Sequence, residues 1–158
     1  MSRHWPCNPI CPLCNNDQET AEHLVLHCNF ARQVWEKMTD WSQQLVQPPQ
    51  NGIQILDWWE KELAHLPKKI RKIKAAMMMY CAWNLWEERN RRVFEQKIKS
   101  PAEVIQEIKH EVHTRNWPVW GQSYPSTYVR PFLYRVCELD YLCNIITVRY
   151  YPCFSFLK

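Results

Sequence analysis

The sequence predicts a mainly α-helical fold, in which a small N-terminal turn and short helices precede a helical bundle and an irregular C-terminal tail. Three observations support this class. Apolar residues recur at helical spacing over most of residues 21–115. The longest predicted helix, residues 68–97, is not interrupted by any helix-breaking residue. Four cysteine and histidine residues lie close together near the N-terminus, where a metal ion can stabilise a segment that has little core of its own.

The N-terminal cluster has the pattern Cys-x2-Cys-x8-His-x4-Cys, formed by Cys11, Cys14, His23 and Cys28. Three sulfurs and one imidazole nitrogen are a donor set of tetrahedral zinc. The first pair can bind from a tight turn that Pro12 stiffens, and the later two must come from a segment that returns to it. We therefore predict a structural zinc site with these four ligands.

Other interpretations of the cysteines remain open at this point. Eight cysteines could form the disulfide framework of a secreted domain, but the N-terminus, Met1–Pro6, has no apolar run typical of a signal peptide. Within a metal site, His27 could replace His23 and Cys7 could supply a thiolate. Local spacing favours His23 over His27.

The spacing of the two later ligands predicts a break in the helix that carries them. Side chains five residues apart on an α-helix point about 140° away from each other, so His23 and Cys28 cannot both face one metal ion from an unbroken helix. We expect a short helix from Ala21, capped by Thr20, to end near Cys28, and a second helix to follow with Asn29 as its cap. The apolar face of the second helix, expected to pack beneath the metal site, consists of Phe30, Val34, Trp35 and Met38.

Three further helices are predicted downstream. Residues 53–65 have apolar positions at helical spacing. Residues 68–97 contain neither Pro nor Gly, and they follow Pro67, which suits the first turn of a helix. Ser100 resembles the cap of a last helix that continues to about Arg115. The apolar positions of the first of these helices are Ile53, Leu56, Trp59 and Leu63.

The chain thus divides into four segments. Residues 1–41 form the zinc-binding segment, residues 42–52 a linker and residues 53–116 a helical region. Residues 117–158 contain four prolines and six of the seven tyrosines, and we expect a poorly ordered tail there, because its β-prone stretch has no obvious strand to pair with. Two apolar stripes run along residues 68–97, so the Met77–Met79 run is expected in the core and not on a base-stacking surface.

Charge is distributed unevenly, although the formal net charge is only +4. Residues 1–65 carry four basic and eight acidic side chains, residues 66–99 carry ten and three, and residues 100–158 carry six and five. The middle segment is therefore net +7, which favours a polyanionic partner such as RNA or DNA.

The basic residues of this segment lie at both ends of its predicted helix. At the first end no acidic residue offsets them; Ile70 and Ile73 are expected to face the core and Lys69 to point away from the others. The predicted nucleic-acid-binding residues, which share one broad side, are Lys68, Arg71, Lys72 and Lys74.

At the other end of this helix, the basic residues are interpreted as a solvated face. Charge runs on helices are most often of this kind. Two pairs at i,i+4 spacing, Glu87–Arg91 and Glu88–Arg92, support the helix without requiring a ligand. Arg89 is included in this interpretation.

Two motifs of the chain resemble a known family. The first consists of Arg3-His4-Trp5, Cys11-Pro12-Leu13-Cys14, Glu19-Thr20-Ala21-Glu22-His23-Leu24-Val25-Leu26-His27-Cys28 and Val34-Trp35. It is similar to the zinc-binding domain that follows the reverse transcriptase in plant non-LTR (LINE-type) retrotransposons. The second, Trp83 to Phe94, resembles the Trp-x2-Trp…Arg-Asn…Val-Phe segment found downstream in such elements.

The resemblance covers about residues 3–98 and has four implications. It assigns the zinc ligands to Cys11, Cys14, His23 and Cys28. It implies template RNA or target DNA as a partner, and an intracellular location that includes the nucleus. It also implies an N-terminally truncated fragment, because the family domain begins well upstream, after a polymerase that this chain lacks.

Catalysis is not expected. Reverse transcription and ribonuclease H chemistry need clustered carboxylates that hold two divalent ions, and the chain has no Asp-Asp pair. The segment His110–His113 lacks the second histidine of the metalloprotease motif, because Thr114 stands in its place. Two glycines are too few for a glycine-rich phosphate loop, and no apolar run is long enough to span a membrane.

The sequence therefore predicts a non-catalytic, zinc-dependent nucleic-acid-binding fragment of a retrotransposon polyprotein, with no small-molecule substrate and no membrane partner. The alternative is a structural or protein-interaction remnant, in which zinc only stabilises the packing of helices. Salt-dependent binding to nucleic acid distinguishes the two.

Overall fold

The computed structural model describes residues 9–114 of the 158-residue chain. The tail predicted for residues 117–158, with its β-prone stretch, lies outside the described residues. Within the described range the protein is mainly helical, and its β-structure is limited to an isolated antiparallel bridge between Ile10 and Gln18. The predicted mainly α-helical class is confirmed.

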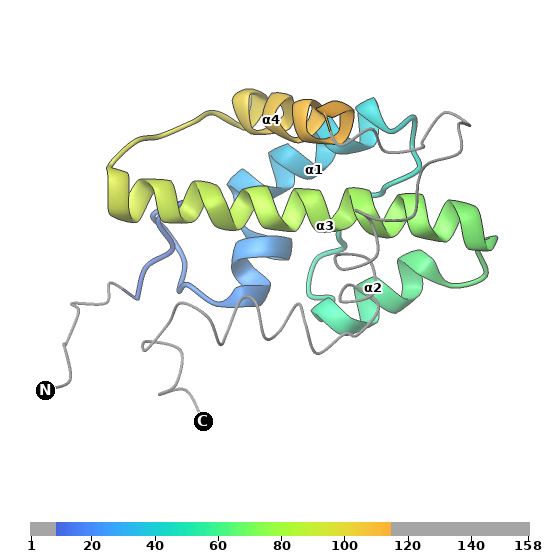
Figure 1. Ribbon diagram of the computed structural model, residues 1–158. Coiled ribbons are helices and arrows are strands. Elements are labelled where there is room, and N and C mark those ends of the chain that lie inside the picture. Colours follow the sequence, from blue (N-terminus) through green and yellow to red (C-terminus); the bar gives the residue numbers. More distant parts are fainter. Residues whose placement is uncertain (1–8, 115–158) are drawn as a thin grey trace, which may run out of the picture. The chain divides into compact units, whose positions relative to one another are not determined.

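Four α-helices and two short π-helical turns follow one another along the described residues (Figure 1). In chain order they are η1 (His23–His27), α1 (Asn29–Trp41), α2 (Ile55–Leu63), α3 (Lys68–Asn90), η2 (Arg91–Glu95) and α4 (Pro101–Thr114). The longest helix, α3, is central, because α1, α2 and α4 all contact it. Helices α1 and α4 also pack against each other.

The core lies between α3 and the helices around it. The Met77–Met79 run is buried, as its position between two apolar stripes predicted. Trp35 of α1 is fully buried; its indole Nε1 donates to the Val25 carbonyl at 2.7 Å, and its ring packs edge-on against Trp58 of α2 with centroids 5.1 Å apart. The predicted apolar face of α1 is confirmed, since all four of its residues are buried: Phe30, Val34, Trp35 and Met38.

Two apolar residues of the predicted helices are exposed, and one of them, Ile70, was predicted to face the core. Leu56 on α2 is 48% exposed, whereas the neighbouring Trp58 is buried. The helix is oriented by the larger indole, which packs against Trp35 and buries more apolar area than a leucine would. Ile70 lies in the first turn of α3 and is 36% exposed; the buried stretch of this helix begins one turn later, at Ile73.

The ends of the last two helices are set by backbone and capping geometry. α3 ends at Asn90, earlier than predicted, and the chain continues as η2 until Gln96 adopts a left-handed conformation with φ of 54°. The predicted cap of α4 is confirmed: Glu103 N–H donates to Ser100 Oγ at 3.3 Å, and Ser100 N–H donates back to the Glu103 carboxylate at 2.7 Å. No helix within residues 9–114 is long and apolar enough to cross a membrane.

Candidate metal centre

Four side chains from two segments converge just before α1. The ligand atoms of Cys11, Cys14, His23 and Cys28 all lie within 4.8 Å of one another. The sulfurs of Cys11 and Cys28 are 4.0 Å apart, and the sulfur of Cys14 lies 3.3 Å from Nε2 of His23. With ordinary zinc–ligand bond lengths, the edges of a tetrahedron are about 3.8 Å between sulfurs and about 3.5 Å between sulfur and nitrogen. The cluster therefore has the donor set of zinc, and these two separations are close to the edges of its coordination tetrahedron.

Cys11 and Cys14 lie on a loop that is closed by backbone hydrogen bonds. Cys11 N–H donates to the Asp17 carbonyl at 2.8 Å, and Asn15 N–H donates to the Cys11 carbonyl at 2.8 Å. Asn15 has a positive φ of 54°, a conformation that asparagine tolerates better than most residues. The loop thus presents both cysteines to the same point.

His23 and Cys28 come together because the turn between them is π-helical. Thr20 Oγ1 accepts the His23 N–H at 3.0 Å, which is the capping contact predicted for a helix that begins at Ala21 and continues into η1. Cys28 N–H then donates to the His23 carbonyl at 2.7 Å, an i→i+5 bond that makes the turn one residue wider than in an α-helix. Residues five apart can therefore point to the same side, which a regular α-helix does not allow.

The cap predicted for α1 is wrong by one residue. Cys28, with an extended ψ of 132°, occupies the N-cap position, and Asn29 is the first residue of the helix. The chain changes direction at the ligand Cys28, between η1 and α1. This change allows the Cys28 sulfur to face the other three ligands.

The alternative ligands are placed differently. Among the described residues, His27 is not part of the cluster, whereas His23 is. Cys7 lies outside the described residues. Cys81 is buried in α3, where burial raises the pKa of its thiol well above the usual value. Every cysteine between residues 9 and 114 is a free thiol, so no disulfide competes with a metal there.

The thiols of Cys11 and Cys28 influence each other strongly. Their shared hydrogen bond lowers the pKa of Cys11 to about 5 against the effect of burial, and the amides of Leu13 and Cys14 assist. The same hydrogen bond and burial both raise the pKa of Cys28. Because metal binding requires thiolates, a divalent cation at this pair would displace its protons.

Comparison with known families agrees with this geometry. Residues 1–35 match the family model described as zinc-binding in reverse transcriptase. This part of the chain is similar to the zinc-binding domain of a reverse transcriptase. The region of similarity contains all four side chains of the cluster and ends at Trp35, inside α1. No curated protein and no solved structure matches the chain.

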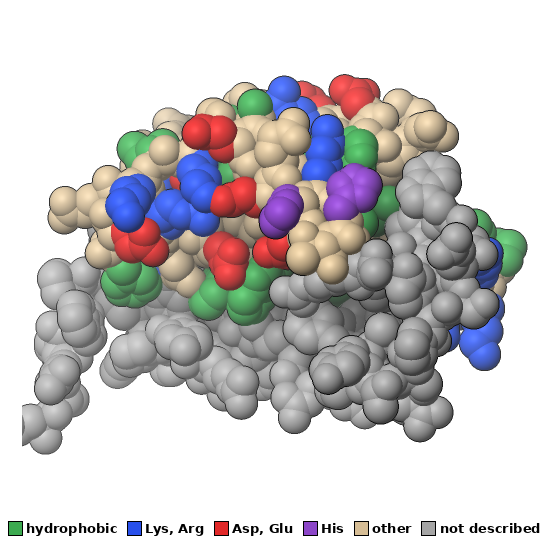
Figure 2. Space-filling view, turned by 45° about the horizontal axis from the view of Figure 1, so that its top comes forward, with side chains coloured by type: hydrophobic (Ala, Val, Ile, Leu, Met, Phe, Trp, Pro, Cys, Tyr) green, Lys and Arg blue, Asp and Glu red, His purple; other side chains and the backbone are tan. Residues whose placement is uncertain are grey.

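Beyond the zinc-binding region, the basic residues at the start of α3 are mostly exposed. Lys68, Arg71 and Lys72 are exposed, and no ion pair joins them to an acid within the described residues. Figure 2 shows Lys and Arg side chains at the right-hand edge, the end at which α3 begins. Lys74 differs, because it is buried and its Nζ lies 2.7 Å from a Glu62 carboxylate oxygen of α2. The premise that no acid offsets the cluster is therefore wrong for Lys74.

The basic residues at the end of α3 are not the solvated face that the sequence predicted. Arg89 is buried and forms two bonds to the Glu19 carboxylate, from Nε at 2.5 Å and from Nη2 at 3.0 Å. Arg91 and Arg92 both bind Glu88, whose side chain is completely buried. The predicted Glu88–Arg92 pair is confirmed, but it lies inside the protein.

Two of these arginines join the two sequence motifs in space. Arg89 and Arg92 belong to the Trp83–Phe94 motif, and they contact Glu19 and the Cys-x2-Cys turn of the zinc-binding region. The sequence showed the two motifs but not their contact, because they are separated by about fifty residues. The only signal in the sequence that could have indicated this contact was the presence of Arg89 and Arg92 within the apolar Trp83–Phe94 motif.

Proposed function

We propose that this protein is a zinc-dependent nucleic-acid-binding module from the reverse transcriptase polyprotein of a plant LINE-type retrotransposon, without catalytic activity of its own. The Cys3His cluster and the family match over residues 1–35 support the zinc-binding part. The Trp83–Phe94 motif supports the retrotransposon origin through its resemblance to the segment downstream in such elements. RNA or DNA is the proposed partner. The proposed site of action includes the nucleus.

The exposed cluster at the start of α3 is the observation that carries nucleic-acid binding. Lys68, Lys69, Arg71 and Lys72 lie within five consecutive positions and are all exposed. Four such charges over little more than one helical turn create a local positive field, and phosphate backbones are the partners that such a field attracts. Lys74 is left out of this surface because its charge is paired with Glu62.

A structural role for the metal supports the absence of catalysis. Four protein side chains surround one point, and four ligands complete the tetrahedral coordination of zinc. Catalytic zinc sites keep one position open for water or substrate. Zinc here would hold the loop of residues 10–18 and the turn η1 together, beneath which α1 packs.

A structural or protein-interaction remnant is the second candidate, and one observation favours it. Six of the ten basic residues between positions 66 and 99 form ion pairs with acidic side chains of the same chain. They are Lys74, Arg89, Arg91, Arg92, Lys97 and Lys99. Much of the local +7 is therefore neutralised before any partner approaches.

The salt dependence of binding tests the proposed function. Zinc-loaded protein is titrated with labelled single-stranded RNA and with duplex DNA over a series of salt concentrations, and binding is followed by fluorescence anisotropy. Four phosphate contacts predict that log affinity falls against log salt with a slope of about −3 for a single strand and slightly more for a duplex. If neither nucleic acid binds at the lowest salt concentration, the structural remnant is the correct function.

A further inference from the structure

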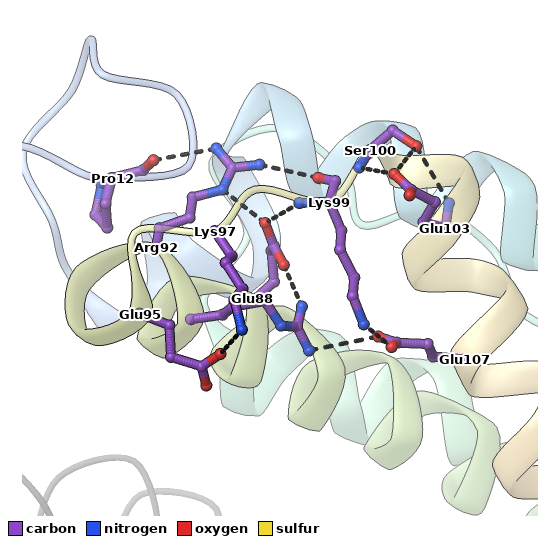
Figure 3. Close-up of polar contacts among 10 residues, drawn as sticks. Pro12, Glu88, Arg92, Glu95, Lys97, Lys99, Ser100, Glu103 and Glu107 are labelled. Atoms are coloured by element: carbon purple, nitrogen blue, oxygen red, sulfur yellow. Dashed lines mark hydrogen bonds and ion pairs between the residues drawn. The ribbon is translucent and has the colours of Figure 1, made fainter.

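Arg92, just beyond the end of α3, contacts the Cys-x2-Cys turn directly (Figure 3). Its Nη1 donates to the carbonyl oxygens of Pro12 at 3.1 Å and Leu13 at 2.9 Å. Pro12 and Leu13 are the two residues between the ligands Cys11 and Cys14. A side chain 80 residues away in sequence thus holds the backbone of the metal-binding turn.

The two carbonyls belong to the peptide groups that carry the amides of Leu13 and Cys14. In a planar trans peptide the C=O and the N–H point in opposite directions. The Pro12 carbonyl shares its peptide group with the Leu13 N–H, and the Leu13 carbonyl shares its group with the Cys14 N–H. Both amides help to lower the pKa of the Cys11 thiol, which is the effect expected of N–H groups close to its sulfur. Arg92 therefore holds the oxygen ends of the two peptide groups that carry the Leu13 and Cys14 amides.

Arg92 is itself fixed on several sides. Its Nε donates to Glu88 Oε1 at 2.7 Å, and its Nη2 donates to the Lys99 carbonyl at 3.3 Å. The guanidinium lies 4.4 Å from the ring centroid of Phe30, in the first turn of α1. The buried Glu88 carboxylate is held in turn by Arg91 and by the Lys99 N–H. The planar guanidinium thus has one orientation, in which four of its five N–H groups are used.

We propose that Arg92 is a positioning residue of the metal centre: by holding the Pro12 and Leu13 carbonyls, it keeps the Leu13 and Cys14 amides directed at the Cys11 sulfur. Three thiolates exceed the charge of one Zn²⁺ ion, so amide donors that disperse charge on a thiolate stabilise the bound state. Contacts that orient ligands in this way change metal affinity by about 10- to 100-fold when they are removed. The inference rests on the zinc centre of the proposed function and not on nucleic-acid binding.

Zinc affinity, measured by competition with a chelator, tests the proposal in Arg92→Gln and Arg92→Lys. Arg92→Gln should bind zinc about 10- to 100-fold more weakly than the wild type. Arg92→Lys should lose less, because one ammonium can retain one carbonyl but not the planar arrangement. The sulfur-to-cobalt charge-transfer band of the cobalt-loaded variants should also shift, since it reports the electron density on the thiolates.

Arg91→Gln is the matched control, because Arg91 binds Glu88 as Arg92 does. Its other ion pair is with Glu107, so it is not predicted to hold the metal-binding turn. Its zinc affinity and cobalt spectrum should remain close to those of the wild type. An Arg92→Gln variant that binds zinc as tightly as the wild type would overturn the proposal. An equal loss in Arg91→Gln would overturn it too, because the effect would then come from Glu88.

A measurement on the wild-type chain covers the case in which the Arg92 variants fail to fold. In protein loaded with cadmium-113, amide protons that donate to a metal-bound sulfur show scalar coupling to the metal in NMR spectra. Coupling is expected at the Leu13 and Cys14 amides, and its absence at both would refute the proposal. If the wild-type chain binds neither zinc nor cadmium, the proposed function fails together with this inference, whereas intact binding without these couplings removes the inference alone.

Discussion

The two ends of α3 carry similar basic sequences in opposite electrostatic surroundings. At the first end Lys68, Arg71 and Lys72 are exposed and make no ion pair within the described residues. At the other end Arg89 and Arg92 are held by carboxylates and carbonyls, with acidic and basic side chains intermixed at the left of Figure 2. The partners of Arg89 and Arg92 include groups 70 to 80 residues away in sequence. A basic run can therefore be a binding surface or an internal connection, and distant residues decide which.

The difference has an energetic consequence. Exposed charges contribute little to stability, whereas removing one partner of a buried ion pair leaves an uncompensated charge and costs about 3–5 kcal/mol. Mutations at the first end of α3 should therefore alter binding and leave the fold intact. Mutations at the other end should alter the fold or the metal site.

The largest effect is expected from loss of a metal ligand. In Cys14→Ser or His23→Gln, zinc content measured by mass spectrometry after dialysis should fall from about one ion per chain toward zero. Structural zinc contributes on the order of 10 kcal/mol of apparent binding free energy, and in a small domain this is also folding free energy. Hydrogen exchange should accelerate most in η1 and in the loop of residues 10–18, and less in the first turns of α3.

His27→Gln is the control for the ligand assignment, since it removes an imidazole four residues away in sequence. This variant should retain its zinc and its exchange pattern. Retention of zinc by His23→Gln together with its loss from His27→Gln would show that the wrong histidine had been assigned.

The next largest effect is expected at the paired end of α3. Arg89→Met removes both bonds to Glu19 and leaves that carboxylate buried without its charge partner. The free energy of unfolding, measured by urea titration, should fall by about 3–5 kcal/mol. Lys72→Met at the exposed end should change it by less than about 0.5 kcal/mol. Equal losses in the two variants would mean that the two ends do not differ.

Charge reversal at the exposed end should give an intermediate effect, seen in binding alone. Arg71→Glu with Lys72→Glu should weaken nucleic-acid binding by about tenfold or more and reduce the salt slope by about 1.5, because two phosphate contacts are lost. The unfolding transition should remain that of the wild type. A variant that binds as tightly as the wild type would place the phosphate contacts elsewhere.

The control for charge reversal changes the net charge equally at other exposed positions. Lys37→Glu with Lys97→Glu suits this purpose, because both lysines are exposed and Lys97 is already paired with Glu95. Its binding should fall less than that of the Arg71/Lys72 variant. A reversal at Arg91 and Arg92 is unsuitable as a control, because both arginines hold the buried Glu88.

The smallest effect is expected at Glu103, which caps the helix that follows the paired end. Hydrogen bonds from the backbone and side chain of Ser100 hold the pKa of Glu103 below the ordinary value of 4.5. Its contribution to stability is therefore present above that value and is lost as the pH falls through the lowered pKa. The NMR titration midpoint of Glu103 should lie below 4.5 and rise toward it in Ser100→Ala. An unchanged midpoint would remove Ser100 as the cause.

Much of the fold could be predicted because its signals are local. The apolar face of α1 follows the helical period, and Ser100 with Glu103 forms a cap from residues three apart. Helical spacing alone did not show that Leu56 of α2 is exposed and Trp58 buried, since Trp58 packs against Trp35 of another helix. The end of α3 at Asn90 was also missed, because no Pro or Gly marks it.

The candidate metal centre also has features that local spacing predicted and features that it did not. The spacing of cysteine and histidine was sufficient to predict the four residues whose ligand atoms the structure places within 4.8 Å of one another. The manner in which His23 and Cys28 meet was not predicted, since a π-helical turn is rare and has no clear sequence pattern. Lys74 was placed on the exposed surface because Glu62 belongs to a different helix and is invisible to local spacing.

The sequence by itself determined the helical class, the donor set of the metal site and the segment in which basic charge is concentrated, because each depends on residue type and short-range spacing. Tertiary structure alone decided which of those charges are available to a partner. Glu19 and Glu62 neutralise Arg89 and Lys74, and the carbonyls of Pro12 and Leu13 bind Arg92. Buried charges persist only where folding brings a partner to them, and a partner brought by folding can come from any position in the chain.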